Sequence, residues 1–432
     1  MGDNLQETKD LSGRLIVTTK DNPQSQKFPA LISLANDQFR CQRCQMVNCQ
    51  STYSITSQLF YCPECLVLGR LTNQDYLIAY PEQNDFVVPP HPLTWTGTLT
   101  PKQHAISCQL CQVQMNKQEH LVWAVTGSGK TEMLFAMLAQ AIRQGERIAL
   151  TAPRVDVCNE LYPRIKAAFR TTGVSLLHGQ GANHYYYSQI LICTVHQLLK
   201  FRAAFDLLIL DECDSYPYVN NPLLHQAVQQ AVKKRHTLIY LSATPSPEYQ
   251  QQIAQGQLNY SLLNRRFHGH DLPEPQFRLI WRQRFNCLNK QLLHSITTLY
   301  QKQQRFLLFV DSIKQAEFIS QLLHQELPNL QQTFVHAKDP LRGQKVQAFR
   351  DNQWQALVTT TILERGVTFF NIDVMVWQAD SHRFNAQTLI QIAGRAGRSA
   401  EHSDNQVIFF AKQYTLAIDQ AIRQIRRLNQ DE

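Results

Sequence analysis

Short, mostly apolar runs that alternate with helical patterns constrain the fold of this chain more than any other feature. Near-continuous runs of this kind are typical of strands in a parallel sheet that helices cover on both faces. They fall into two groups, 120–124, 147–150, 190–193, 207–210 and 237–241, followed by 306–310, 333–335, 356–359, 374–377 and 407–410. We therefore predict an α/β fold with two doubly wound parallel-sheet lobes.

Segments rich in helix breakers divide the chain. A length of 432 residues is typical of two or three domains. Three prolines between positions 89 and 92 exclude a helix and a central strand there, and the stretch 264–275 lacks any hydrophobic period. The predicted parts are a small N-terminal domain over 1–92, a first lobe over 93–262, a linker over 263–280 and a second lobe over 281–432.

Charge and hydropathy narrow the class of protein. The 42 basic and 34 acidic side chains leave a net charge of +8, which favours a polyanionic partner. A hydrophobic content of 44% builds ordinary cores and excludes a disordered chain. No apolar run reaches the ~18 residues that span a bilayer, and the first residues lack the pattern of a signal peptide. We therefore expect a protein that is made and kept in the cytosol.

Residues 124–131, AVTGSGKT, follow an apolar run and precede an amphipathic stretch. Such a loop suits a nucleotide phosphate. Its glycines let backbone N–H groups converge, a helix N-terminus attracts the anion, and a Lys and a hydroxyl serve phosphate oxygens and Mg²⁺. Ala124 replaces the first glycine of the usual pattern, which costs little where the backbone angle is ordinary. The predicted ATP-binding residues are Thr126, Gly127, Ser128, Gly129, Lys130 and Thr131.

An acidic pair ends the run 207–210. Because carboxylates at the end of a buried strand are costly unless they serve a cation, we predict that Asp211 binds Mg²⁺ and that Glu212 orients the attacking water. Asp214 is predicted to cap a helix. Ser242 and Thr244 end a later strand, and we consider them candidates for coupling the nucleotide to the other lobe.

In the second lobe, residues 391–398 read QIAGRAGR and place Arg395 and Arg398 three positions apart. Two guanidinium groups at this spacing suit bidentate contact with phosphate oxygens. We predict that both arginines reach the nucleotide from the second lobe. A solvated basic helix is the alternative interpretation.

Five of the eleven cysteines lie between positions 41 and 65. Two C-x-x-C pairs separated by seventeen residues match the spacing of a tetrahedral zinc ribbon. The predicted zinc ligands are Cys41, Cys44, Cys62 and Cys65, and Cys49 is expected to be a bystander. Cys108 and Cys111 repeat the spacing inside an expected helix, and we predict that they are core residues.

These motifs, in this order and with TTILERGVT at 360–368, resemble those of superfamily 2 helicases and translocases, which have two RecA-like lobes. Within that superfamily, the segments 126–132, 152–158, 211–218 and 267–270 look like those of ComFA, the late-competence ATPase of naturally transformable Gram-positive bacteria. The resemblance implies a DNA-dependent ATPase with ATP, Mg²⁺ and Zn²⁺ as cofactors. It also implies a motor that pulls single-stranded DNA in through a membrane channel from the cytosolic side, beside other competence proteins and with homo-oligomers possible.

The resemblance assigns further roles by position. Gln103 is similar to the glutamine that reads adenine upstream of the phosphate loop. The positions that hold the nucleic-acid backbone in such motors correspond to Pro153, Arg154, Thr194, Ser312 and Thr360. Thr368 departs from the pattern, because many relatives carry an aspartate there, and its role stays open.

The spacing of the second-lobe motifs bears on what the motor does to DNA. Residues 306–311, 360–368 and 391–398 follow one another at intervals of about fifty and about thirty residues. Such intervals hold helices and strands of the lobe but leave no room for a wedge that separates two strands. We therefore predict translocation along one strand with little unwinding of duplex.

Two other interpretations remain. A primosomal-type duplex helicase has a similar phosphate loop, but its cysteine clusters lie between the later motifs. A zinc-ribbon nucleic-acid-binding module with a degenerate nucleotide domain is disfavoured by the intact Lys130, Glu212 and Arg398. The tyrosines at 185–187 either stack on bases or pack as a surface turn.

Overall fold

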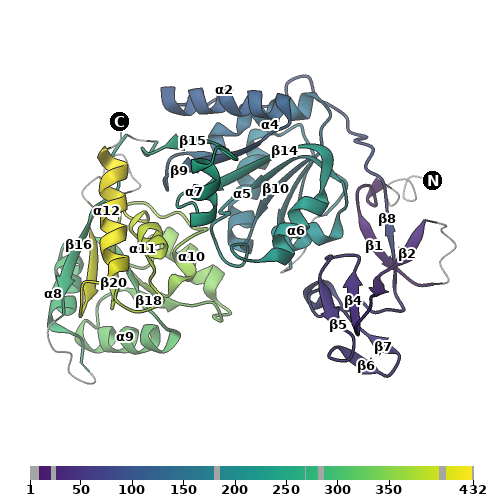
Figure 1. Ribbon diagram of the computed structural model, residues 1–432. Coiled ribbons are helices and arrows are strands. Elements are labelled where there is room, and N and C mark those ends of the chain that lie inside the picture. The colour runs from purple at the N-terminus through teal and green to yellow at the C-terminus, as the bar shows by residue number, and fades with distance from the viewer. Residues whose placement is uncertain are drawn as a thin grey trace. The chain divides into compact units, whose positions relative to one another are not determined.

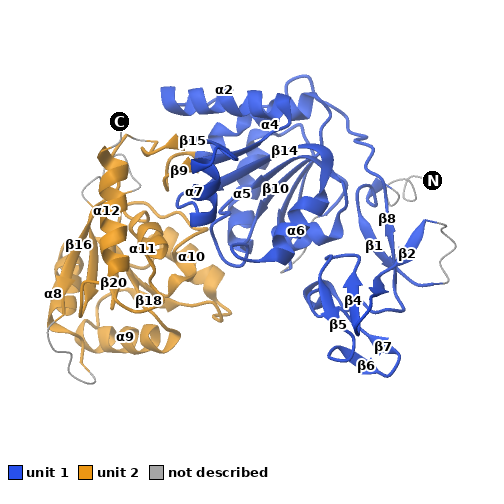
Figure 2. Cartoon of the chain, viewed as in Figure 1, with its two compact units in different colours: residues 1–122, 130–261 blue, residues 123–129, 262–432 orange. Residues whose placement is uncertain are grey.

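The computed structural model describes residues 9–20, 26–179, 185–267, 269–280, 287–397 and 405–430 (Figure 1). The chain forms two compact units (Figure 2). The first unit consists of residues 1–122 and 130–261, and the second unit consists of residues 123–129 and 262–432. The phosphate loop up to Gly129 therefore belongs to the second unit, whereas Lys130 belongs to the first.

A seven-stranded sheet in the order β11-β12-β10-β13-β14-β9-β15 is the centre of the ATP-binding part. Neighbouring strands from β11 to β14 pair in parallel. The sequence predicts five of the seven strands and misses β11 and β15, which lie at the two edges. The strands are β9 (Glu119–Ala124), β10 (Ile148–Ala152), β11 (Val174–Leu177), β12 (Ile190–Thr194), β13 (Phe205–Leu210), β14 (Val232–Ser242) and β15 (Asn259–Leu263).

Helices surround this sheet, and local signals define where they begin. At the start of α2, Thr100 Oγ1 accepts a hydrogen bond from Gln103 N (3.3 Å) while Gln103 Oε1 accepts one from Thr100 N (2.8 Å), and Pro101 follows the cap. The helices are α2 (Pro101–Asn116), α3 (Lys130–Met133), α4 (Phe135–Arg143), α5 (Val155–Ala168), α6 (Pro222–Ala231) and α7 (Pro247–Ala254), with the 3₁₀ helix η2 (Val195–Lys200).

The helix α2 corrects the prediction for two cysteines. Its buried face includes Ile106, Leu110 and Val113. Cys108 is exposed and Cys111 is half-buried, so the prediction that both are core residues is wrong for Cys108. The reason is the helical period, because a residue two positions from a buried one falls on the opposite side of the helix.

The second unit contains a six-stranded sheet in the order β16-β21-β20-β17-β19-β18. All neighbouring strands pair in parallel. The strands are β16 (Pro275–Leu279), β17 (Arg305–Phe309), β18 (Gln332–Val335), β19 (Ala356–Thr359), β20 (Ile372–Trp377) and β21 (Val407–Ala411). The helices are α8 (Lys290–Gln301), α9 (Ile313–Glu326), α10 (Arg342–Arg350), α11 (Ala386–Ala393) and α12 (Leu416–Gln430), with the 3₁₀ helix η3 (Thr361–Leu363).

Alternate residues of these strands enter two separate hydrophobic clusters. Leu307 and Phe309 of β17 belong to one cluster, and Phe306 and Leu308 belong to the other. Successive side chains of a strand point to opposite faces, so both faces of this sheet are covered. The predicted α/β fold with two parallel-sheet lobes is confirmed.

One strand lies inside the segment predicted as a linker. Residues 275–279 form β16, an edge strand that pairs with β21 from Pro275↔Val407 to Leu279↔Ala411. A proline is tolerated as the first residue of an edge strand, because its missing N–H leaves no partner unpaired. Because prolines and polar residues surround this strand, hydrophobic periodicity in the sequence does not predict it.

The N-terminal part consists of small antiparallel sheets. One has the order β1-β8-β2, another is β3-β4-β5, and a third is the hairpin β6-β7. The elements are β1 (Leu15–Thr18), β2 (Lys27–Pro29), β3 (Leu31–Ser33), β4 (Gln38–Cys41), β5 (Val47–Cys49), β6 (Ser54–Thr56), β7 (Leu59–Phe60), the 3₁₀ helix η1 (Leu66–Leu68) and β8 (Tyr76–Ala79).

A buried ion pair attaches this part to the seven-stranded sheet. The guanidinium of Arg147 pairs with the carboxylate of Glu82, and both side chains are 0% exposed. Tyr187 donates its hydroxyl to Glu82, and the centroid of its ring lies 4.8 Å from Arg147 Cζ. Tyr186 donates to Val174 O (2.9 Å). The hydroxyls of Tyr186 and Tyr187 are therefore bound to protein groups, which favours the surface turn over stacking on bases.

We predict that Glu82→Gln lowers the free energy of unfolding by about 3 kcal/mol, because it leaves the buried charge of Arg147 without its partner. Unfolding of the full chain in urea, followed by circular dichroism, measures the change. Asp85→Asn is the matched control. It breaks the pair between Lys9 and Asp85, whose side chains are 49% and 62% exposed, and should change stability little. Equal effects of the two variants would contradict the prediction.

Candidate nucleotide and metal sites

The phosphate loop connects β9 to α3. Gly127 has φ of +79° and Gly129 has φ of +73°, and side chains rarely adopt this left-handed conformation. Ser128 and Thr131 are buried, and Lys130 begins α3. Glycine is needed at these two positions because their φ angles are positive. The loop therefore has the local conformation expected for phosphate binding.

The acidic pair lies at the carboxyl end of β13. Asp211 N donates to Thr151 O at the end of β10 (2.8 Å), and Glu212 N donates to Asp211 Oδ1 (2.9 Å). Burial raises the pKa of Asp211, while the positive charge of Lys130 opposes the shift. Lys130 and Asp211 therefore interact electrostatically. A half-buried carboxylate that interacts with a lysine suits a divalent cation bound to phosphate, so these residues fit Mg²⁺ with ATP.

Asp214 has a different role from the predicted helix cap. Its Oδ2 accepts a 2.6 Å hydrogen bond from Thr244 Oγ1, and both side chains are buried. The next helix, α6, begins eight residues later and takes Asn221 as its N-cap. The cap prediction is therefore wrong, because the chain around Asp214 forms turns and the next helix begins only after Asn221. The contact joins the acidic segment to the Ser242–Thr244 segment.

Gln103 is 1% exposed and takes part in the capping box of α2. Its amide oxygen accepts from the backbone of Thr100, which fixes the side chain at the first turn of the helix. Its predicted contact with adenine stays a prediction.

The residues predicted to hold DNA follow the ends of strands. In the first unit, Pro153 and Arg154 come directly after β10, and Thr194 is the last residue of β12. These two strands are parallel and adjacent. In the second unit, Ser312 caps α9 through Gln315 N (3.3 Å), and Thr360 follows β19. Carboxyl ends of parallel strands are where ligands bind in open α/β sheets.

Arg395 holds the backbone of another motif. It is 4% exposed, and its Nε and Nη2 donate to Glu364 O (2.8 Å and 2.6 Å) while Nη1 donates to Val367 O. The contact joins the turn after α11 to the segment 360–368. The predicted contact of Arg395 with phosphate stays a prediction, and Arg398 lies outside the described residues.

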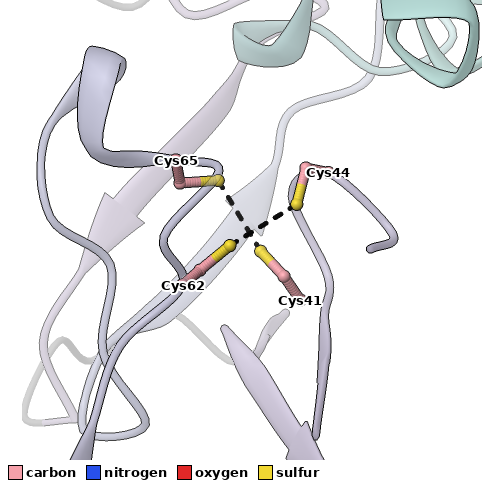
Figure 3. A group of neighbouring side chains, drawn as sticks. All are labelled: Cys41, Cys44, Cys62 and Cys65. Carbon is pink, nitrogen blue, oxygen red and sulfur yellow. Dashed lines mark hydrogen bonds between the residues drawn. The ribbon is translucent and has the colours of Figure 1, made fainter. Parts of the chain in front are cut away.

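The four predicted zinc ligands lie together, all buried, with their sulfurs within 4.8 Å of one another (Figure 3). Cys41 Sγ is 3.7 Å from Cys65 Sγ, and Cys44 Sγ is 3.6 Å from Cys62 Sγ. Tetrahedral Zn²⁺ with Zn–S bonds of ~2.3 Å requires S···S distances of roughly 3.8 Å. The four side chains therefore fit a structural zinc ion, which would crosslink the two knuckles.

Arg43, inside the first C-x-x-C pair, was not anticipated as part of this site. Its Nε donates to Cys65 Sγ (3.2 Å), and its Nη2 donates to Cys65 O (3.2 Å) and Gly69 O (2.9 Å). The pKa of Cys65 is lowered, chiefly by hydrogen bonds from the other three thiols and further by the charge of Arg43. The sequence signal that could predict this contact is a basic residue between two metal ligands. Cys49 Sγ donates a hydrogen bond to Asp37 Oδ2 and is not one of the four clustered cysteines.

Family comparisons define the class of the protein. The DEAD/DEAH box helicase family matches residues 101–253, and the helicase conserved C-terminal domain matches residues 284–400. With the phosphate loop and the two parallel sheets, these matches define a superfamily 2 ATP-dependent nucleic-acid enzyme with RecA-like lobes.

Relatives narrow this class. The competence protein ComFA of Streptococcus pneumoniae is 38% identical over 434 residues, which cover 98% of this chain and 98% of the relative. The competence protein ComFA of Bacillus subtilis is 38% identical over 92% of this chain and 87% of the relative. The chain therefore belongs to the ComFA family.

Solved structures agree on the fold. The DEAD-box helicase Mss116 bound to ssRNA and UDP-BeF matches with a TM-score of 0.59 and 16% identity, over 77% of this chain and 78% of that chain. RecG bound to a three-way DNA junction matches with a TM-score of 0.55 and 17% identity, over 78% of this chain and 46% of that chain. At these identities the likeness shows the fold alone.

We predict one zinc per chain, and Cys62→Ser should lose it, because three sulfurs no longer close the tetrahedral site. Metal analysis by mass spectrometry of the purified full chain measures the zinc content. Cys49→Ser is the matched control and should keep one equivalent. Two equivalents in the wild type, or none, would contradict the prediction.

Proposed function

We propose that the chain is an ATP-driven translocase that moves single-stranded DNA during import of transforming DNA in natural competence. The observation that carries the proposal is the electrostatic interaction between Lys130, in the phosphate loop, and Asp211, in a chain that is 38% identical to a competence protein over almost its full length. A phosphate-loop lysine that interacts with a carboxylate suits phosphoryl transfer from ATP to water.

The proposed roles follow from the chemistry of each group. Lys130 and the backbone of 127–131 would bind the phosphates, and Thr131 and Asp211 would hold Mg²⁺, which would neutralise phosphate charge. Glu212 orients water and accepts its proton. Gln103 contacts adenine, and Arg395 and Arg398 contact the transferred phosphate from the second lobe. Thr126 is the remaining residue of the phosphate loop that we propose binds ATP.

DNA contacts are proposed at the strand ends. Pro153, Arg154 and Thr194 in one lobe, with Ser312 and Thr360 in the other, would hold the phosphate backbone. Such contacts are indifferent to base sequence and weaken with salt.

The position of the protein in the cell is also a proposal. We infer peripheral attachment at the inner face of the membrane, beside the uptake channel and other competence proteins, and homo-oligomers are compatible with this place. Within the described ranges, no helix combines the length and the apolar character that crossing a bilayer demands.

The spacing within the second lobe supports translocation over strand separation. Between β17 and η3, the described chain forms only α9, β18, α10 and β19, which belong to the lobe itself. A wedge against a DNA fork requires an inserted element, and none lies in this interval. This spacing ranks the primosomal-type duplex helicase second among the candidate functions.

We expect Glu212→Gln to bind ATP but to hydrolyse it at least ~100-fold more slowly, because a positioned base contributes about that factor or more. Lys130→Ala should instead lose ATP binding. Steady-state ATPase assays and equilibrium binding of a fluorescent ATP analogue separate the two effects. Glu248→Gln, on an exposed residue of α7, is the control and should keep the wild-type rate. Wild-type turnover by Glu212→Gln would remove the role assigned to this carboxylate.

We expect single-stranded DNA to stimulate the ATPase far more than blunt duplex, with binding that falls as salt rises. ATP turnover with oligo(dT), with duplex and without DNA measures this. Processive separation of a long duplex by the purified protein would favour the primosomal-type helicase. Lack of any ATP hydrolysis would favour the nucleic-acid-binding module with a degenerate nucleotide domain.

A further inference from the structure

Arg266 is a buried cation that follows β15 and belongs to the second unit. It is 3% exposed, and burial lowers its pKa to about 10, which keeps it charged at neutral pH. Its Nη1 donates to Ala396 O (2.7 Å) and to Gly397 O, and its Nη2 donates to Gly394 O (3.2 Å). In the part of the chain that the structure describes, these carbonyls are its partners and no carboxylate pairs with it.

The same segment contacts the phosphate loop. Phe267 N donates to Gly127 O (3.1 Å), and a Cβ placed on Gly127 would lie 3.9 Å from Arg266 Cδ. Thr126 Oγ1 donates to Gly394 O (3.3 Å). A Cβ on Gly394 would lie 2.1 Å from Thr126 Oγ1, so only glycine fits at this position. The loop, the Arg266 segment and residues 394–397 therefore meet at one place within the second unit.

Arginine is suited to this place for a chemical reason. Residues 394–397 follow the C-terminal end of α11, where helices leave carbonyl groups without intrahelical partners. A guanidinium offers several N–H donors in a rigid plane, so one side chain can hold three carbonyls of a turn in a fixed arrangement. A lysine offers a point charge on a flexible stem and cannot reproduce that geometry.

We propose that Arg266 is a positioning residue for ATP hydrolysis, which holds the glycine turn 394–397 against the phosphate loop. The inference rests on the proposed function and deepens it. The turn carries Arg395, and the peptide oxygen of Gly397 is one of the groups that Arg266 holds. Arg266 therefore fixes the turn beside Thr126 and Gly127 of the phosphate loop, an arrangement that hydrolysis would need, whereas Lys130 and Thr131 would bind the nucleotide without it.

The test uses the full-length chain with Arg266→Gln, Arg266→Lys and Gly394→Ala. We expect Arg266→Gln to lower kcat for ATP at least tenfold, while KM and the Kd of a fluorescent ATP analogue stay within threefold. Arg266→Lys should not restore kcat, because charge without the planar fork does not hold the turn. Arg265→Gln, on the exposed neighbouring arginine, is the matched control and should keep wild-type kcat and KM.

A double-mutant cycle decides whether Arg266 acts through the turn. Arg266→Gln and Gly394→Ala disturb one contact from two sides, so their effects on kcat should be clearly less than additive. If Arg266→Gln does not fold by circular dichroism, the cycle is measured with Arg266→Lys. Wild-type kcat in Arg266→Gln overturns the proposal. Additive effects in the cycle, or a raised KM at unchanged kcat, which would mark a ground-state phosphate ligand, overturn it as well.

All assays are run with and without single-stranded DNA. A wild-type ATPase that ignores DNA but still loses kcat in Arg266→Gln would remove the proposed function and leave the role of Arg266 in place. A DNA-stimulated wild-type ATPase whose kcat is unchanged in Arg266→Gln would remove the role of Arg266 and leave the proposed function in place.

Discussion

The hydrogen bond from Asp211 N to Thr151 O extends the ladder between β13 and β10 by one residue, and the nucleotide site depends on it. The register places Thr151 opposite Leu210, so the acidic pair emerges at the same edge of the sheet as Pro153 and Arg154. A shift of one residue would turn each side chain to the other face of the sheet. Parallel pairing therefore brings the predicted cation-binding and DNA-binding groups to the same end of the sheet.

At the amino ends of the same strands, polar contacts attach the sheet to the N-terminal part. Arg147 precedes β10 and Asp206 lies near the start of β13, and the carboxylate of Asp206 accepts from Arg147 N (2.9 Å) and Lys233 Nζ (2.8 Å). The buried pair of Arg147 with Glu82 connects this end of the sheet to the N-terminal part that carries the cysteine cluster. Attachment and the predicted ligand-binding residues thus lie at opposite ends of the same strands.

Buried cations in this chain act on carbonyls and sulfurs as well as on carboxylates. Arg266 holds the carbonyls of the glycine turn, Arg395 inside that turn holds those of Glu364 and Val367, and Arg43 holds Cys65 and the carbonyl of Gly69. The guanidinium is suited to this because its donors diverge within one plane.

Much of the fold and of the candidate site could be predicted from the sequence, because the signals are local. Apolar runs predicted the inner strands of both sheets, and the two C-x-x-C pairs predicted the cysteine cluster, since each knuckle is formed by neighbouring residues. The edge strand β16 was missed because prolines and polar residues surround it. Asp214 was misassigned because its partner, Thr244, lies thirty residues away and is reached only through the strand order.

The sequence by itself determined which elements form and which motifs end them, because periodicity and turn chemistry act over a few residues. Only the tertiary structure decided what each charge does. By composition, Arg147 and Arg266 simply add to the net charge of +8. Burial removes both from solvent, and one pairs with Glu82 while the other, 128 to 131 residues from its partners, holds the turn at 394–397. Such partners follow from packing between distant segments, and no local pattern encodes them.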